Sequence, residues 1–158
     1  MTFKLSTRSL EKLEGVHPLL VKVVETAIQC TQTDFGVVFG VRTLAEQQEL
    51  FDKGASKTMQ SKHLIQDDGY SHAVDLMAYV GSRGSWELSL YDDLADAMKI
   101  AAKEHGAHIR WGGSWTVDDI RTWEGTMEEA MNSYTDLRRS QGRRPFIDGP
   151  HFELRSLA

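Results

Sequence analysis

The sequence predicts an α+β domain with a small, mainly antiparallel sheet and flanking helices. Apolar residues recur at helical spacing in two long segments, and short apolar runs bounded by glycine lie between them. Helices come first, followed by strands interleaved with helices, which favours α+β. A chain of 158 residues, 41% hydrophobic and 26% charged, is predicted to form one domain over residues 1–158.

Two helices are expected between residues 6 and 30. Ser6 or Thr7 can cap the first helix, and Pro18 suits the first turn of the second. Apolar residues of the second helix then share one face: Leu20, Val23, Val24, Ala27 and Ile28. The lone Cys30 ends this stretch, and we expect a buried, inert thiol in preference to a catalytic nucleophile.

The first strand is predicted over residues 35–39, as a buried run between glycines. Thr43-Leu-Ala-Glu46 is a capping-box pattern that opens a helix, which Gly54 can end. Residues 72–80 are apolar enough for a central strand, yet Asp75 lies in the middle. A buried carboxylate costs several kcal/mol unless it is paired or metal-bound, so Asp75 requires a partner.

A helix, two strands and a polar segment are expected in the C-terminal half. The helix covers residues 90–106, and the strands cover residues 107–111 and 151–154. Residues 116–147 are polar and charged and are predicted to form a helical insertion outside the core. Lys and Arg total 18 against 23 Asp and Glu, giving a net charge of -5, so we expect no nucleic-acid partner.

Several histidines lie near acidic residues in the sequence. His63 and His72 precede Asp75, and His151 follows Asp148. Imidazole and carboxylate groups suit zinc. Their spacing forms no HExxH or Cys-x-x-Cys pattern, so spacing alone favours ordinary histidines over a metal site.

Three motifs that follow one another along the chain favour a metal site over ordinary histidines. They are Ser61-Lys-His63, His72-Ala-Val-Asp75-Leu and Asp148-Gly-Pro-His151-Phe-Glu-Leu. Together they resemble the signature of the LAS-type zinc metallopeptidases, which include D-Ala-D-Ala carboxypeptidases and dipeptidases and phage endolysins that are L-alanyl-D-glutamate peptidases. Further matches extend the resemblance over nearly the whole chain: Gly40-Val-Arg42-Thr, Gly54-Ala-Ser56 and Arg110-Trp-Gly-Gly-Ser-Trp115.

The resemblance implies a Zn2+ site on the sheet. His63, Asp75 and His151 would hold the metal, and Asp148 would be the general base for a metal-activated water. Arg42 would stabilise the oxyanion or anchor a substrate carboxylate, with a structural salt bridge as its alternative.

Three more polar residues belong to the predicted site. Ser61 would bond the substrate backbone or cap its own loop. Glu153 would share a strand face with His151 and hold His72 or another group around the ligands. His72 is also the alternative to His63 as a ligand, although the Ser-x-His context favours His63.

Two segments depart from the family pattern. Residues 65–71 are a predicted loop insertion, in which Asp67 and Asp68 indicate a solvated acidic loop, or alternatively a cation site. Residues 116–147 form either a substrate wall or lid, or a plain surface elaboration. Four arginines in this segment predict a solvated helix end, with contact to anionic wall polymer or lipid head groups as the alternative: Arg138, Arg139, Arg143 and Arg144.

The resemblance implies an endolysin that hydrolyses the L-alanyl-D-glutamate bond of the bacterial peptidoglycan stem peptide. The alternatives are a D-Ala-D-Ala carboxypeptidase or dipeptidase, and a non-catalytic wall-binding module. We expect a monomer with no membrane span and no signal peptide. It would stay in the host cytoplasm until holin-mediated release brings it to the periplasmic cell wall.

Overall fold

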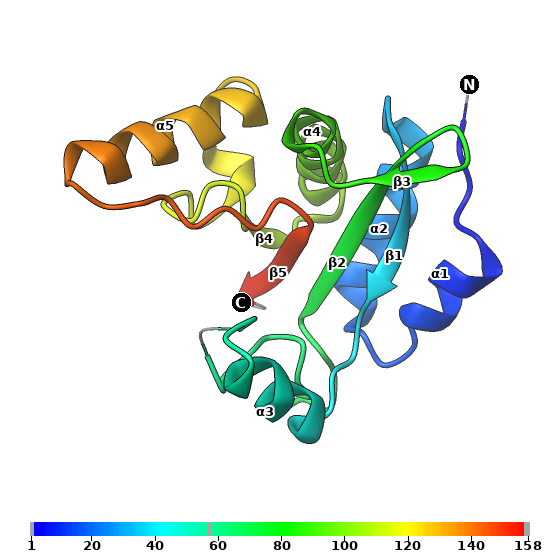
Figure 1. Cartoon of the computed structure of the whole chain (residues 1–158). Coiled ribbons are helices and arrows are strands. Elements are labelled where there is room, and N and C mark those ends of the chain that lie inside the picture. The colour runs from blue at the N-terminus through cyan, green and yellow to red at the C-terminus, as the bar shows by residue number, and fades with distance from the viewer. Residues whose placement is uncertain (1, 57, 157–158) are drawn as a thin grey trace.

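Five strands form one sheet at the centre of the fold (Figure 1). The structure is a computed structural model and describes residues 2–56 and 58–156. The strands are β1 (Asp34–Phe39), β2 (Ala73–Val80), β3 (Arg83–Ser85), β4 (His108–Trp111) and β5 (His151–Ser156). Their order is β1-β2-β5-β4, with β3 beside the last residues of β2. All strand pairs are antiparallel, which confirms the predicted sheet.

The first and third helices begin at the predicted caps, Ser6 and Thr43. The helices are α1 (Thr7–Lys12), α2 (Pro18–Cys30), α3 (Leu44–Asp52), α4 (Leu88–His105), α5 (Met127–Ser140) and the short 3-10 helix η1 (Ile120–Thr122). Ser6 caps α1, and Thr43 and Thr126 form complete capping boxes with the glutamates three residues later. In Figure 1, α3 lies beyond the end of the sheet where β1 ends and β2 begins.

The hydrophobic core lies between the sheet and the packed pair α2 and α4. All five apolar residues predicted for the buried face of α2 are buried. In β2, Val74, Leu76 and Ala78 belong to this core. Side chains alternate across a strand, so Asp75 lies on the other face of the sheet. The apolar strand therefore carries its carboxylate away from the core.

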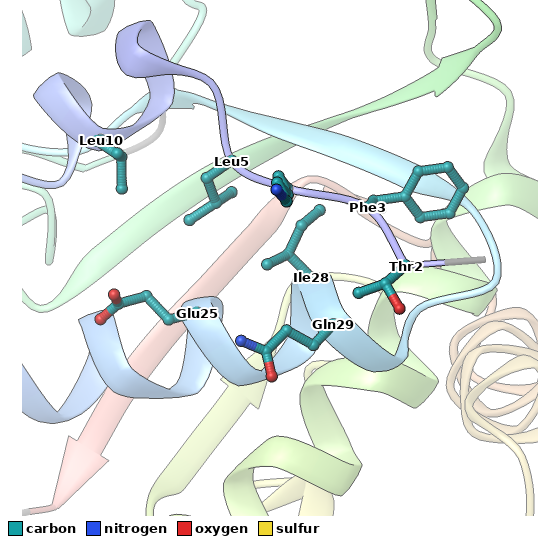
Figure 2. A pocket seen from close by; sticks show the side chains of 8 residues that line it. Thr2, Phe3, Leu5, Leu10, Glu25, Ile28 and Gln29 are labelled. Atoms are coloured by element: carbon teal, nitrogen blue, oxygen red, sulfur yellow. The ribbon is translucent and has the colours of Figure 1, made fainter.

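The N-terminal segment packs along α2 and leaves a pocket of about 290 Å³ between them (Figure 2). Leu5 and Ile28 are among the residues that line it, together with Phe3 and Leu10. None of the predicted site residues lines this pocket. Among the described residues, no helix combines the length and the apolar character that crossing a bilayer requires.

The prediction of a buried Cys30 is wrong, because this residue is exposed. It is the last residue of α2, just after the buried turn that contains Ala27 and Ile28. Its Sγ atom lies 3.6 Å from the carbonyl oxygen of Ala27. Partial desolvation and the charge of Glu104 raise the pKa of the thiol, which disfavours the reactive thiolate.

Residues 116–147 also differ from expectation, because they contribute to the core. Ile120 of η1 and Met127, Ala130 and Met131 of α5 are buried in the main hydrophobic cluster. The apolar positions of α5 recur three and four residues apart and form a face that packs on α4. The Asp96 carboxylate accepts a hydrogen bond of 2.9 Å from the Met127 backbone nitrogen, which ties α4 to the start of α5.

Asp92, on α4, is nearly buried, and its Oδ1 atom has no hydrogen-bond partner in the described part of the chain. Burial, followed by the charges of Glu128, Asp96 and Asp93, raises the pKa of Asp92 from 3.8 to about 6. The folded state therefore binds this proton more tightly than the unfolded state. Stability is lost as the pH rises from about 4 through 6.

We therefore expect Asp92→Asn to raise the free energy of unfolding by about 1–3 kcal/mol at about pH 7.5, with almost no gain at about pH 4. Urea denaturation of both proteins at the two pH values measures the difference. An equal gain at both values would show that the ionised carboxylate is not the cause.

Candidate active site

Three predicted ligand residues meet on the sheet face opposite the α2–α4 core. His63 lies in the loop before β2, Asp75 lies in β2, and His151 is the first residue of β5. Asp75 and His151 are direct cross-strand partners, which places their side chains together. Asp75 Oδ1 is 3.2 Å from His63 Nε2 and 3.4 Å from His151 Nδ1. One donor atom from each residue lies within 4.8 Å of the others, so the group could hold a metal ion.

The tautomer of His63 is set by the backbone of the chain after β1. His63 Nδ1 lies 2.8 Å from the carbonyl oxygen of Gly40, so this nitrogen carries the proton and donates it. Nε2 then presents its lone pair towards Asp75. Both His63 Nε2 and Asp75 Oδ1 are buried without a well-aligned hydrogen-bond partner in the described residues. Two such acceptor atoms facing each other fit a bound cation.

Gly40 can hold His63 because it lacks a side chain. A Cβ atom at this position would lie 2.1 Å from the carbonyl oxygen of Lys12, at the end of α1. A larger residue would therefore push the chain away from α1 and move the carbonyl that orients His63. The sequence matches the family at Gly40, but no role was predicted for this residue.

Glu153 orients the second imidazole of the group. His151 Nε2 lies 2.8 Å from Glu153 Oε1, and the other carboxylate oxygen accepts a 3.2 Å bond from Arg155. His151 Nε2 therefore donates its proton to Glu153, and Nδ1 faces Asp75. Glu153 and His151 thus share one face of β5, as strand alternation predicts.

The roles considered for His72 are wrong. Its Nε2 atom lies 2.7 Å from Asp68 Oδ2, and its ring packs 5.5 Å from His17. His72 precedes Ala73, the cross-strand partner of Glu153, so strand alternation directs the two side chains to opposite faces. His72 is therefore neither a partner of Glu153 nor a member of the metal-binding group.

The ionisation of Asp75 and of His151 depends on the neighbouring residues of the group. Burial opposes ionisation of Asp75, but the nearby imidazoles of His151 and His63 outweigh it and hold the pKa of this carboxyl well below its usual range. Burial likewise opposes protonation of His151, but Asp75 and Glu153 raise its pKa to about 10. Without a cation, His151 is therefore protonated at neutral pH, and metal binding must release that proton.

Arg42 lies at the edge of the group. Its Nη2 atom is 3.8 Å from Asp75 Oδ2, and Nη1 donates a 2.8 Å bond to Gln47. Ser61 Oγ accepts a 3.1 Å bond from the His63 backbone nitrogen, which shows that Ser61 caps its own loop. Gln47 is fully buried and was missed, because α3 has no clear apolar face that would mark an inward polar residue.

Asp148 is positioned by the turn after β4. Its backbone nitrogen donates a 2.8 Å bond to the Gly112 carbonyl, and its own carbonyl accepts a 3.1 Å bond from His151 nitrogen. A Cβ atom on Gly112 would lie 2.2 Å from the Asp148 carbonyl oxygen, so this approach requires glycine. The Trp111 indole also donates a 2.7 Å bond to the carbonyl oxygen of Gly149, which places Trp111 beside the site.

Charged residues of the metal-binding group shift the pKa of the Asp148 carboxyl. Burial raises its pKa, and Asp75 adds to this effect, whereas His151, His63 and Arg42 lower it. The net pKa is raised towards neutrality, which suits a group that both takes and returns a proton.

The comparisons with known proteins agree with this geometry. Residues 1–155 match a family described as phage L-alanyl-D-glutamate peptidase. The chain belongs to this family. It is 29% identical over 158 residues to the L-alanyl-D-glutamate peptidase of Escherichia phage T5, covering 98% of this chain and 99% of that relative. This result confirms the predicted resemblance.

A solved structure supports the same assignment. The L-Ala D-Glu endopeptidase ChiX of Serratia marcescens superposes with a TM-score of 0.70 and 32% sequence identity. The match covers 97% of this family member and 90% of ChiX. The similarity in fold and in sequence therefore extends over nearly the whole chain.

Proposed function

We propose that this protein hydrolyses the L-alanyl-D-glutamate bond of the peptidoglycan stem peptide, with one zinc ion held by His63, Asp75 and His151. The observation that carries the proposal is the convergence of these three donor atoms within 4.8 Å, in a member of the phage L-alanyl-D-glutamate peptidase family. Three protein ligands leave the fourth position of a tetrahedral zinc site open, as catalytic zinc sites require.

The donor types favour zinc over the common alkaline-earth ions. Two imidazole nitrogens and one carboxylate oxygen suit zinc, whereas magnesium and calcium prefer sets composed of oxygen. Gly40 and Glu153 each accept the proton of the imidazole nitrogen that faces away from the group. Such partners fix the tautomer and raise the basicity of a ligand histidine.

When bound, zinc supplies Lewis acidity, lowering the pKa of water to about 7 and polarising the scissile carbonyl. Asp148 takes the proton of the attacking water on its carboxylate. It then returns the proton to the nitrogen of the D-glutamyl residue as the peptide bond breaks. The raised pKa of Asp148 supports both transfers.

Arg42 is the proposed electrostatic partner of the reacting carbonyl. Its guanidinium is always charged, and Gln47 holds one of its nitrogens at 2.8 Å. This fixed donor would stabilise negative charge as it develops on the carbonyl oxygen, or anchor a substrate carboxylate. The ion pair with Asp75, at 3.8 Å, is long enough to leave the remaining guanidinium donors for substrate.

The relatives favour the endopeptidase over a D-Ala-D-Ala carboxypeptidase, because both compared proteins are named for the L-Ala-D-Glu bond. Digestion of purified peptidoglycan followed by mass spectrometry distinguishes these activities. New N-terminal D-glutamate supports the proposal, and release of free alanine contradicts it. We also propose that the protein is a monomer that acts on the wall after holin-mediated release from the host cytoplasm.

The metal requirement is tested by turbidity loss of Gram-negative cells whose outer membrane has been permeabilised. We expect lysis by the purified protein, its loss after chelation, and its return when zinc is restored. A folded, zinc-loaded protein without lytic activity would instead favour the wall-binding alternative. Lysis that persists after complete metal removal would contradict zinc catalysis.

A further inference from the structure

A basic pocket lies next to the metal-binding group and is lined by residues of β4, of α5 and of the segments that follow them. Figure 1 shows the chain after α5 returning towards β5. The pocket has a volume of about 480 Å³. Three arginines, Arg110, Arg138 and Arg143, line it together with aromatic residues that include Trp115 and Phe146. No acidic residue is among the described residues that line it. This concentration of positive charge contrasts with the net charge of -5 for the whole chain.

The basic pocket adjoins the metal-binding group through Trp115. The Trp115 ring lies 5.5 Å from the ring of His151, and the Arg110 guanidinium lies 5.1 Å above Trp115. Arg110 is the cross-strand partner of Glu153, so it shares the sheet face of Glu153 and His151. A peptide held across the metal-binding group on this face would therefore reach the arginines.

The segment that encloses the pocket is held by specific bonds. Tyr134 Oη lies 3.2 Å from both the backbone nitrogen and the carbonyl oxygen of Phe146. Arg138 donates bonds of 3.3 and 3.1 Å to the carbonyl oxygen of Arg144. Phe146 in turn stacks on Trp115 at 6.2 Å. These contacts fix the return of the chain beside the site.

Arg143 is the arginine with the greatest capacity to bind a ligand. Its side chain is exposed and makes no hydrogen bond or ion pair within residues 2–56 and 58–156. Arg110 and Arg138 already donate to backbone carbonyls, although each keeps further N–H donors. An anion in the pocket would therefore contact the guanidinium of Arg143 and those of Arg110 and Arg138, which their bonds to backbone carbonyls hold in place.

We propose that this basic pocket binds a carboxylate of the stem peptide and so positions the peptide across the metal-binding group. The inference rests on the proposed function. Guanidinium groups bind carboxylates through paired, charge-assisted hydrogen bonds, and the aromatic residues give the pocket an apolar wall beside them. The stem peptide offers two sources of this chemistry: the α-carboxylate of its γ-linked D-glutamyl residue, and the side-chain carboxylate of a diaminopimelyl residue at the next position.

The proposal is tested with four soluble L-alanyl-γ-D-glutamyl-diaminopimelyl peptides. In all four the C-terminal carboxyl, which forms the next peptide bond in a longer stem peptide, is an amide. Of the two remaining carboxylates, one peptide has both free, two have one or the other converted to its amide, and one has both amidated. We expect the zinc-loaded protein to bind the recognised free carboxylate about tenfold more tightly than its amide, seen as a change in KM and in calorimetric affinity with little change in kcat. The singly amidated peptides identify which carboxylate is recognised.

Arg143→Gln removes the positive charge of the pocket that has no partner among the described residues, and leaves Arg110 and Arg138 in place. We expect it to abolish this preference while binding of the doubly amidated peptide stays within about twofold. Arg139→Gln is the matched control, because Arg139 is an exposed neighbour on α5 that lines a different pocket. The control should keep the full preference. Equal affinity for free and amidated peptides, or equal weakening of all of them in Arg143→Gln, would overturn the proposal.

The same measurements separate this inference from the proposed function. Cleavage at the L-alanyl-D-glutamate bond without any carboxylate preference contradicts the basic pocket as a substrate site and leaves the proposed function intact. A calorimetric preference that Arg143→Gln removes, without cleavage of any peptide, contradicts the peptidase and supports carboxylate binding.

Discussion

Asp148→Asn is expected to lower kcat about 10²–10⁴-fold while the bound zinc content stays unchanged. Asparagine keeps the shape of the side chain and the backbone bonds to Gly112 and His151, but it cannot take a proton from water. Hydrolysis of a stem peptide, together with metal analysis of the same sample, measures both quantities.

Two controls test whether the loss of kcat comes from the missing proton acceptor and not from unfolding or from loss of any surface carboxylate. Asp148→Asn should unfold at a temperature equal to or above that of the parent protein, because the substitution removes a partly desolvated charge and no side-chain hydrogen bond to the fold's described residues. Asp136→Asn, on the exposed surface of α5, should retain full activity. Near-normal turnover by Asp148→Asn would show that another group moves the proton.

Asp75→Asn is expected to weaken zinc binding by more than about 100-fold and to abolish lysis with it. The size follows because removing a partner outside the ligand set already costs about 10–100-fold in metal affinity. Asp75 bridges both histidines, so its negative charge is the centre of the donor group. Zinc retained after dialysis against a chelator of known affinity measures the loss.

Glu153→Gln provides a graded comparison, because it leaves all three donor side chains in place. It replaces only the carboxylate that orients His151, at 2.8 Å, and we expect a loss of zinc affinity of about 10–100-fold. Asp75→Asn should bind zinc more weakly than Glu153→Gln, and excess zinc should restore activity only in Glu153→Gln. Unchanged zinc affinity in Asp75→Asn would mean that the ion is held elsewhere.

The segment from residue 116 to residue 147 connects the fold to the site in a way that neither alternative in the sequence analysis describes fully. Its apolar residues are part of the core, and its aromatic and basic residues border the metal-binding group. A single segment thus stabilises α4 through one face and shapes the substrate side of the sheet through another. Because most residues of the segment are polar, its few buried apolar residues were not recognised as core positions in the sequence.

Local interactions made several elements predictable from the sequence. The capping boxes at Thr43 and Thr126 and the proline at the start of α2 act within one turn of chain, so the nearby residues determine them. The apolar face of α2 follows from helical periodicity alone. The ligand triad was predicted from motif order and resemblance, and the conflict of Asp75 with an apolar strand independently pointed to a partner.

Only the tertiary structure decided which partners the polar groups take. Asp75 and His151 lie far apart in the sequence, and the register of β2 against β5 pairs them, while His63 joins them from the loop before β2. The same register excludes His72 from the face of Glu153, since one residue of displacement along a strand reverses the face of a side chain.

The sequence by itself thus determined the helices, the main strands and the chemical types in the site, because these depend on residues close along the chain or on a motif. The tertiary structure decided the orienting roles of Gly40 and Gln47 and the composition of the basic pocket. Those depend on distances between segments far apart in sequence, and no local pattern encodes them.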